Sequence, residues 1–157
     1  MNNIIKSLSD LGIVLPEPTK PVANYSPYVI FKNTIYVSGQ IPFKDGTIAY
    51  QGKVGKDISI NEAIDASEIC LLNNLALLNL ATNNNLNRII SCIKINVFIN
   101  SADDFFEQPI VADGASNLIK KIFKDNGDHA RSAVSCNSLP KNASVEIDSV
   151  FQLGDLK

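Results

Sequence analysis

Arg131 and Glu146 are the side chains of this sequence whose types and spacing best fit a binding or catalytic site. Each lies in a segment of alternating residues, and the segment Leu139–Asn142 between them has the composition of a turn. A hairpin folded at this turn would place Arg131 and Glu146 on neighbouring strands. An arginine guanidinium donates two parallel hydrogen bonds to a carboxylate. The pair therefore predicts either a site that binds a carboxylate or a structural cross-strand ion pair.

Other kinds of catalytic or binding site have less support in the sequence. His129 is the only histidine and the three cysteines lack metal-ligand spacing, so we expect no metal site. The segment Ser38–Gln40 does not match the nucleophile motif of serine hydrolases. The segment Gly52–Gly55 lacks the spacing of a phosphate-binding loop, and a glycine-rich connection is the simpler interpretation.

The hydrophobic pattern predicts the elements that would position these residues. Ser59-Ile60-Asn61-Glu62 is a capping box, which marks the start of a helix rich in Ala and Leu. In chain order the expected elements are strands at Tyr28–Phe31 and Thr34–Gln40, a helix at Asn61–Ala81, a strand at Arg88–Asn100, a helix at Ala115–Phe123, and strands at His129–Asn137 and Ser144–Leu153. The strand before the second helix is expected to bury one face, made of Ile93, Ile95, Val97 and Ile99. Two helices against a mixed sheet predict an α+β layer fold.

An additional segment precedes this core. Met1–Leu11 has apolar residues at helical spacing, and Gly12 follows where a glycine often ends a helix. The prolines within residues 16–21 favour an extended strap. We therefore expect residues 1–21 to form an N-terminal helix and strap, and residues 22–157 to form one domain.

Composition and charge restrict the class of protein. The chain has 157 residues, 45% of them hydrophobic, so it is long enough to bury a core without disulfides or metals. Its formal net charge of −2 argues against a DNA- or RNA-coating surface, and no apolar run is long enough to span a membrane. The N-terminal residues lack the pattern of a secretory signal, and the number of cysteines is odd. We therefore expect a cytoplasmic protein that binds neither DNA nor membrane, and RNA is not favoured as a partner.

Three separated motifs point to a known family. The first is Tyr25-Ser26-Pro27-Tyr28, the second is Tyr36–Pro42, and the third joins His129–Val134, Leu139–Asn142 and Val145–Ile147. In this order they resemble the motifs of the RidA/YjgF/YER057c/UK114 superfamily, and the resemblance spans roughly residues 22–151. It implies a chorismate-mutase-like α+β fold, with a mixed sheet packed on one side by two helices. It also implies a homotrimer with clefts between subunits.

The resemblance also implies an activity and a set of site residues. The RidA branch hydrolyses reactive enamine or imine intermediates, such as 2-aminoacrylate and 2-iminobutanoate, to a 2-keto acid and ammonia without a cofactor. By this resemblance Arg131 clamps the substrate carboxylate and Glu146 positions the attacking water. The further residues expected at the cleft are Tyr28, Ser38, Gly39, the backbone of Ala133, Gly114 and His129. The expected ligand is therefore a small imine or enamine that carries a carboxylate.

Three features depart from the RidA pattern. Gly114 falls where an asparagine is usual, His129 replaces the proline before the arginine, and residues 1–21 are additional. Together, residues 1–21, the segment Asp113–Ser116 and His129 resemble a longer branch of the superfamily. His129 has two interpretations: an acid or base that titrates near neutrality, or a structural residue at the strand edge or at a subunit contact.

Three functions therefore stay open. The first is the imine or enamine deaminase. The second is a trimeric protein that binds a small carboxylate and has a regulatory role without turnover. The third, an endoribonuclease or translation inhibitor, has the least support, because the net charge is acidic and the sequence has no basic stripe interleaved with aromatic residues.

Overall fold

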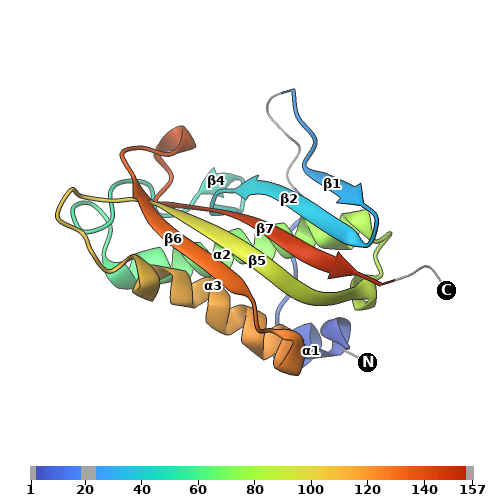
Figure 1. The fold of residues 1–157 in the computed structure, drawn as a ribbon. Helices are drawn as coiled ribbons and strands as arrows, with labels where there is room; N and C mark the ends of the chain where they lie inside the picture. Colours follow the sequence, from blue (N-terminus) through green and yellow to red (C-terminus); the bar gives the residue numbers. More distant parts are fainter. Residues whose placement is uncertain (1–2, 19–23, 155–157) are drawn as a thin grey trace.

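The protein folds into two layers, a sheet and the helices that cover one of its faces. The computed structural model describes residues 3–18 and 24–154. Its elements are α1 (Ile4–Asp10), β1 (Tyr28–Phe31), β2 (Thr34–Gln40), β3 (Phe43–Lys44), β4 (Thr47–Ile48), α2 (Ile60–Ala81), η1 (Leu86–Arg88), β5 (Ile89–Asn100), α3 (Gln108–Phe123), η2 (Lys124–Asn126), β6 (Ala130–Cys136), η3 (Pro140–Asn142) and β7 (Val145–Leu153), where η marks a short 3₁₀-helix. The main sheet has the strand order β1-β2-β7-β5-β6, and α2 and α3 lie along the same face of it (Figure 1). The predicted α+β layer fold is confirmed.

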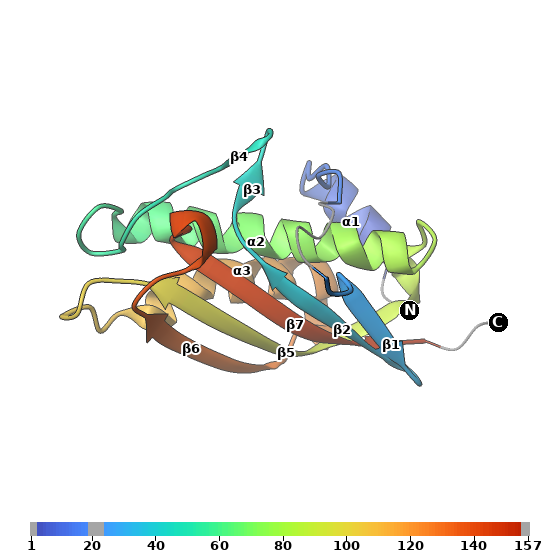
Figure 2. The same cartoon turned by 90° about the horizontal axis from the view of Figure 1, so that it is seen from above.

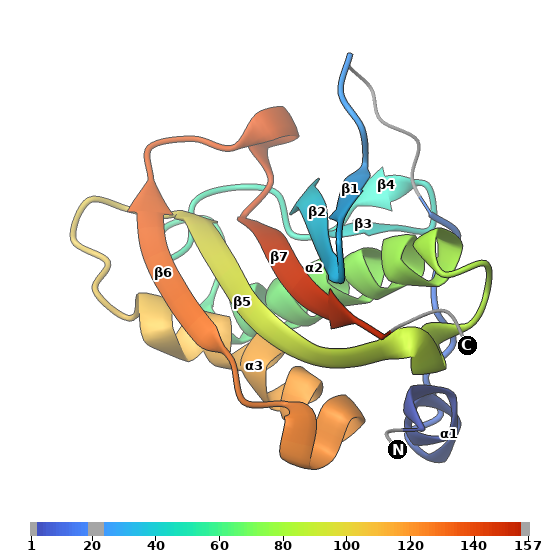
Figure 3. The same cartoon turned by 45° about the vertical axis from the view of Figure 1, so that its right-hand side comes forward.

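The strand order corrects the hairpin expected at Leu139–Asn142. β5 lies between β6 and β7, so Arg131 and Glu146 are not on neighbouring strands (Figure 3). β6 runs parallel to β5, and β7 runs antiparallel to it. The reason is the long connection through α3, which returns the chain to the end of the sheet where β5 began. β6 then pairs with one edge of β5, and the loop through η3 carries the chain across to the other edge.

The central strand β5 has one face buried under the helices and one open face. Alternate residues from Ile95 to Ile99 are buried, as their pattern predicts. Ile93, expected on the same face, is exposed. The pairing with β7 is irregular between Cys92 and Lys94, and this shifts the alternation so that Cys92 is buried instead.

Both main helices begin with features that the sequence carries. At the start of α2, the Ser59 side chain accepts from the Glu62 backbone N–H, and the Glu62 carboxylate accepts from the Ser59 backbone N–H at 2.8 Å. This confirms the predicted capping box. α3 begins at Gln108, well before the expected Ala115, with Pro109 in its first turn. Proline is favourable there because the first helical N–H groups have no partner within the helix.

The N-terminal helix belongs to the same core. The Asn3 side chain caps α1, and Gly12 follows it with a φ of +66°, as expected for a glycine that ends a helix. Ile4 is fully buried and Leu8 nearly so, and α1 packs against α3 and η1. The predicted boundary between residues 21 and 22 lies outside the described residues.

Ile4→Ala is expected to lower the free energy of unfolding by about 2–4 kcal/mol, because it leaves a cavity in the core. Ile5 is the matched control: its side chain is 47% exposed, and Ile5→Ala should change stability by no more than about 0.5 kcal/mol. Urea denaturation followed by circular dichroism measures both variants. If Ile4→Ala lowered the free energy of unfolding as little as Ile5→Ala does, α1 would not contribute to the core.

The described residues offer neither a membrane span nor a metal cluster. Between residues 3–18 and 24–154, no helix is long and apolar enough to cross a bilayer. In the same two ranges, no three His, Cys, Asp or Glu side chains are grouped so as to hold a metal ion. The cysteines are free thiols, and two of them, Cys70 and Cys92, are buried.

Candidate functional site

Arg131 lies on the edge strand β6 and points toward α3. It is in register with Ile95 of β5, so its side chain is on the helix-covered face of the sheet. Its Nη1 donates to Asp113 Oδ1 at 2.7 Å and to Ser116 Oγ at 3.0 Å, both on α3. The Arg131 side chain remains 24% exposed and that of Asp113 54%. The arginine is thus held by the helix and still reachable by a ligand.

His129 extends this contact into a network. Its Nδ1 lies 2.8 Å from the Gly127 carbonyl oxygen, and its Nε2 lies 3.0 Å from Ser116 Oγ. A carbonyl oxygen can only accept, so Nδ1 donates to it, and Nε2 shares the other hydrogen bond with the Ser116 hydroxyl. Asp113, Ser116, His129 and Arg131 therefore form a continuous chain of hydrogen bonds, the arginine cluster. Whether His129 also acts as an acid or base stays a prediction.

Glu146 lies over Gly39 on the other face of the sheet. Its neighbours in β7, Val145 and Ile147, are buried under the helices, so Glu146 points to the open face. The pairing of β2 with β7 is irregular in the stretch that contains Gly39. A Cβ atom on Gly39 would overlap Glu146 Oε1 and lie 2.9 Å from the carboxyl carbon. Gly39 therefore leaves open the space that the carboxylate fills.

Partial burial changes the acidity of Glu146. Desolvation raises its pKa above the ordinary value, and the negative charge of Asp148 raises this pKa further. Asp148 is itself held by Asn96, whose Nδ2 donates to Asp148 Oδ1 at 2.7 Å. A carboxyl whose pKa is closer to neutrality exchanges protons more readily with a bound water or amine. Glu146 is therefore suited to acid–base chemistry.

The raised pKa predicts that Glu146→Gln stabilises the protein near neutral pH. A carboxyl whose pKa is higher in the folded state costs folding free energy as pH rises through its unfolded pKa, and the cost is complete above its folded pKa. At acidic pH both states are protonated and the cost is absent. Thermal unfolding should show a higher Tm for Glu146→Gln at about pH 7.5 and equal Tm values below about pH 4. Equal Tm values at both pH values would contradict the prediction.

The structure does not bring Arg131 and Glu146 together within one chain. They lie on opposite faces of the sheet, and β5 separates their strands. Strand β1 lies at the edge of the sheet opposite β6 (Figure 2). Tyr28, at the start of β1, packs against the core. The Ser38 hydroxyl donates to the Ser26 carbonyl oxygen at 2.7 Å, a contact that fixes the chain entering β1. The predicted site residues therefore fall into separate groups on one chain.

Gly114 and Ala133 are packed positions beside the arginine cluster. Gly114 is buried where α3 meets α2, and a Cβ atom there would lie 2.5 Å from the Ile64 carbonyl oxygen. A larger side chain would therefore push the two helices apart. Ala133 is half-buried, in register with Val97, and packs against the core. That either one contacts a ligand stays a prediction.

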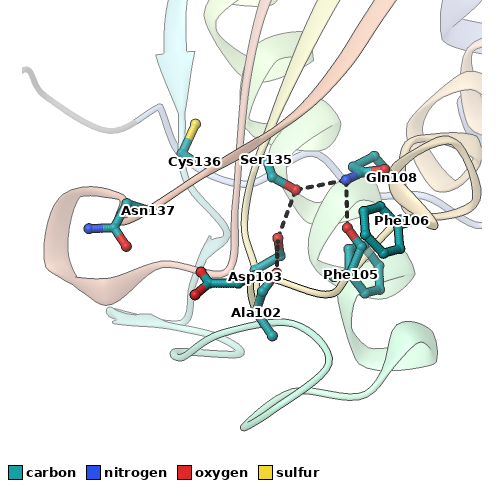
Figure 4. Close-up of a pocket in the computed structure, with 9 residues that line it drawn as sticks. Ala102, Asp103, Phe105, Phe106, Gln108, Ser135, Cys136 and Asn137 are labelled. Carbon is teal, nitrogen blue, oxygen red and sulfur yellow. Dashed lines mark hydrogen bonds between the residues drawn. The ribbon is translucent and has the colours of Figure 1, made fainter.

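A separate surface pocket lies toward the end of β6 that is remote from Arg131 (Figure 4). Its volume is about 380 Å³, and it is formed by the end of β6 and the connection between β5 and α3. Ser135 Oγ accepts from Ser101 Oγ at 2.7 Å and from Gln108 Nε2 at 2.9 Å. These contacts fasten the start of α3 to β6, and so help to set the position of α3 at the arginine cluster.

Asp113 and Ser116 are the candidate site residues that sequence reasoning missed. They are three positions apart and therefore share one face of a helix. The signal is present in the sequence, but a helix that begins at Ala115 leaves Asp113 outside it. The observed start at Gln108, with Pro109 in the first turn, places both on one helix and lets them face the strand that carries Arg131.

The sheet and the two helices that cover one of its faces define an α+β layer protein. Residues 6–152 match the family described as "YjgF/chorismate mutase-like, putative endoribonuclease". The chain belongs to this family, and the predicted superfamily is confirmed.

Three similar proteins illustrate the family. Protein TCP17 of Trypanosoma cruzi is 37% identical over 153 residues, which cover 97% of this chain and 95% of that protein. The 2-iminobutanoate/2-iminopropanoate deaminase of Dermatophagoides farinae is 30% identical over 143 residues, which cover 88% of this chain and 92% of the deaminase. The crystal structure of Atu1372 from Agrobacterium tumefaciens, a protein of unknown function, has 45% identity and a TM-score of 0.89, covering 96% of this chain and 92% of that one.

Proposed function

We propose that this protein hydrolyses small imines or enamines that carry a carboxylate, such as 2-iminobutanoate, to a 2-keto acid and ammonia. The observation that carries the proposal is Glu146, a half-buried carboxyl that lies over Gly39 and has a raised pKa. Arg131 supplies an anchor for the ligand carboxylate at the edge of the sheet. The similarity to a 2-iminobutanoate/2-iminopropanoate deaminase supports the same chemistry.

The proposed reaction needs one anchored carboxylate and one directed water molecule. Arg131 binds the carboxylate and so holds the imine carbon, C2, in place. Glu146 takes a proton from a water molecule whose oxygen adds to C2, and the proton passes to the nitrogen. The C2–N bond of the resulting carbinolamine then breaks and ammonia leaves. The hydroxyl on C2 gives its proton, through Glu146, to the departing nitrogen and becomes the keto carbonyl.

A cleft between subunits would bring the separated residues together. Within one chain Arg131 and Glu146 lie on opposite faces of the sheet, so a small ligand cannot contact both. The open face also carries exposed apolar side chains, namely Val29, Phe31, Tyr36 and Val134. An exposed apolar patch of this kind is typical of a protein–protein interface. The proposal therefore includes a homotrimer, as the family resemblance implies, with Arg131 of one copy facing Glu146 of another.

Two measurements test the proposal. An amino acid oxidase generates 2-iminobutanoate from 2-aminobutanoate, and the release of 2-oxobutanoate is compared with spontaneous hydrolysis. We expect acceleration in proportion to protein concentration, and a trimeric mass by light scattering. A monomer in solution would overturn the site between subunits, and a folded trimer without acceleration would overturn the activity on this imine.

A trimer that binds a small carboxylate without turnover is the second candidate. The observation that favours it is Gly114, which has no side chain where the resemblance expects an asparagine and which leaves no room for one against Ile64. A polar contact from that position is therefore missing. Binding of 2-oxobutanoate without acceleration of imine hydrolysis would select this candidate.

A further inference from the structure

Among residues 3–18 and 24–154, the hydrogen bonds of Arg131 are confined to one of its three guanidinium nitrogens. Nη1 donates to Asp113 Oδ1 at 2.7 Å and to Ser116 Oγ at 3.0 Å, which uses both of its N–H groups. Within the described part of the chain, Nε and Nη2 donate no hydrogen bond. The Nε–Nη2 edge carries two parallel N–H groups and matches the two oxygens of a carboxylate. Helix α3 therefore holds the arginine by Nη1, and the Nε–Nη2 edge is left for a ligand.

The two acceptors on α3 are themselves fixed. Ser116 is buried, its hydroxyl oxygen accepts from Arg131, and the same hydroxyl is hydrogen-bonded to His129 Nε2 at 3.0 Å. The Gly127 carbonyl oxygen holds the other ring nitrogen of His129 at 2.8 Å. The hydroxyl of Ser116 is thus hydrogen-bonded to Arg131 on one side and to His129 on the other, and it cannot move without losing one of these contacts. Nη1 of Arg131 is consequently held by side chains of α3 whose own positions are fixed.

Asp113 also sets the charge at the site. Its carboxylate balances the guanidinium charge, so the pair attracts an anion less strongly by net charge than a free arginine would. Because both side chains are partly exposed to water, the ion pair adds little to the stability of the fold. Its main effect is to fix the orientation of the guanidinium. Affinity for a ligand then depends on a planar group that can accept both hydrogen bonds from the free edge.

We propose that Asp113 and Ser116 are positioning residues that hold Nη1 of Arg131 and thereby aim its Nε–Nη2 edge at the ligand carboxylate. The inference rests on the proposed function, because it takes a carboxylate as the ligand. It assigns a role to two residues of α3 that do not contact the ligand themselves. It also explains why a charge-balancing aspartate can lie beside an arginine that binds an anion.

The test measures the binding of 2-oxobutanoate to the full-length protein by isothermal titration calorimetry. Asp113→Ala should raise the Kd about tenfold, because the arginine loses its stronger support. Asp113→Asn keeps an acceptor oxygen for Nη1 and should stay within about threefold of the wild type. Ser116→Ala should raise the Kd about fivefold. Asp10→Ala, which removes the exposed Lys6–Asp10 pair, is the control and should leave the Kd unchanged.

A ligand-free measurement separates this inference from the proposed function. In ¹⁵N-labelled protein without ligand, a guanidinium held at Nη1 has restricted rotation about its Nε–Cζ bond, so its Nη1 and Nη2 signals stay distinct. This restriction should be lost in Asp113→Ala and kept in Asp113→Asn. If the wild type binds no 2-oxobutanoate, the carboxylate-binding function fails and the aiming of Arg131 at a carboxylate fails with it. A second outcome overturns only the positioning role. In that outcome Arg131→Ala binds 2-oxobutanoate more weakly than the wild type, but Asp113→Ala binds it as tightly as the wild type or more tightly.

Discussion

Arg131→Ala is expected to reduce kcat/KM for 2-iminobutanoate by at least about 100-fold. Hydrogen bonds to a charged group contribute about 1.5–3 kcal/mol, which corresponds to a rate change of about 10- to 150-fold. The substitution also leaves the Asp113 carboxylate without its partner, and this charge then repels the ligand carboxylate. Both effects weaken the binding of the substrate carboxylate, so the combined loss of kcat/KM exceeds the loss from either effect alone.

Two further variants show which part of Arg131 matters. Arg131→Lys keeps the charge and loses the planar pair of donors, so it should recover only part of the activity. Asp113→Ala combined with Arg131→Ala removes the unpaired carboxylate and should also recover part of the loss. Circular dichroism and light scattering check that each variant folds and assembles. Activity of Arg131→Ala within threefold of the wild type would show that the arginine does not bind the ligand.

Gly39→Ala is expected to abolish most of the activity and to destabilise the protein by about 1–3 kcal/mol, as inserting an extra methyl group does at a closely packed position. The added methyl would occupy the place of the Glu146 carboxylate and push this side chain away. The backbone of Gly39 does not require a positive φ, so the effect is steric and not conformational. Steady-state kinetics with 2-iminobutanoate and urea denaturation measure the two consequences.

A double variant distinguishes the clash from a general disturbance of β2. Glu146→Ala removes the carboxylate, so adding Gly39→Ala to it should cause little further loss of stability. The activity should stay low in both, because neither protein has the carboxyl. An equal destabilisation by Gly39→Ala with and without Glu146 would contradict the steric explanation. It would indicate that the strand itself cannot carry a side chain at this position.

The sequence predicts the elements of this fold well where the signals are local. The capping box at Ser59 and Glu62 marks the start of α2 to within a residue, because it depends only on a short stretch of chain. The alternation along β5 holds from Ile95 to Ile99. It fails at Ile93, because the irregular pairing with β7 that displaces it depends on another strand. A pattern within one strand cannot show where its partner bulges.

The candidate site was less predictable, because its contacts join distant parts of the chain. Arg131 and Glu146 stand out by type, and the motifs around them carry the resemblance to the family. Their placement on neighbouring strands is wrong, since both segments alternate equally well whether they pair with each other or with β5. The partners of Arg131 on α3 were missed for a related reason. Whether a helix face meets a given strand depends on where the helix starts and how it packs.

By itself the sequence determined the class of fold, the helix starts with capping signals, the family and the residue types available for chemistry. Only the tertiary structure decided that β5 separates β6 from β7, that Glu146 fills the space over Gly39, and that Asp113 and Ser116 hold Arg131. The physical reason is that caps and alternation arise from interactions between residues close in the chain. Strand order and side-chain partners arise from packing between residues far apart, which no local pattern specifies.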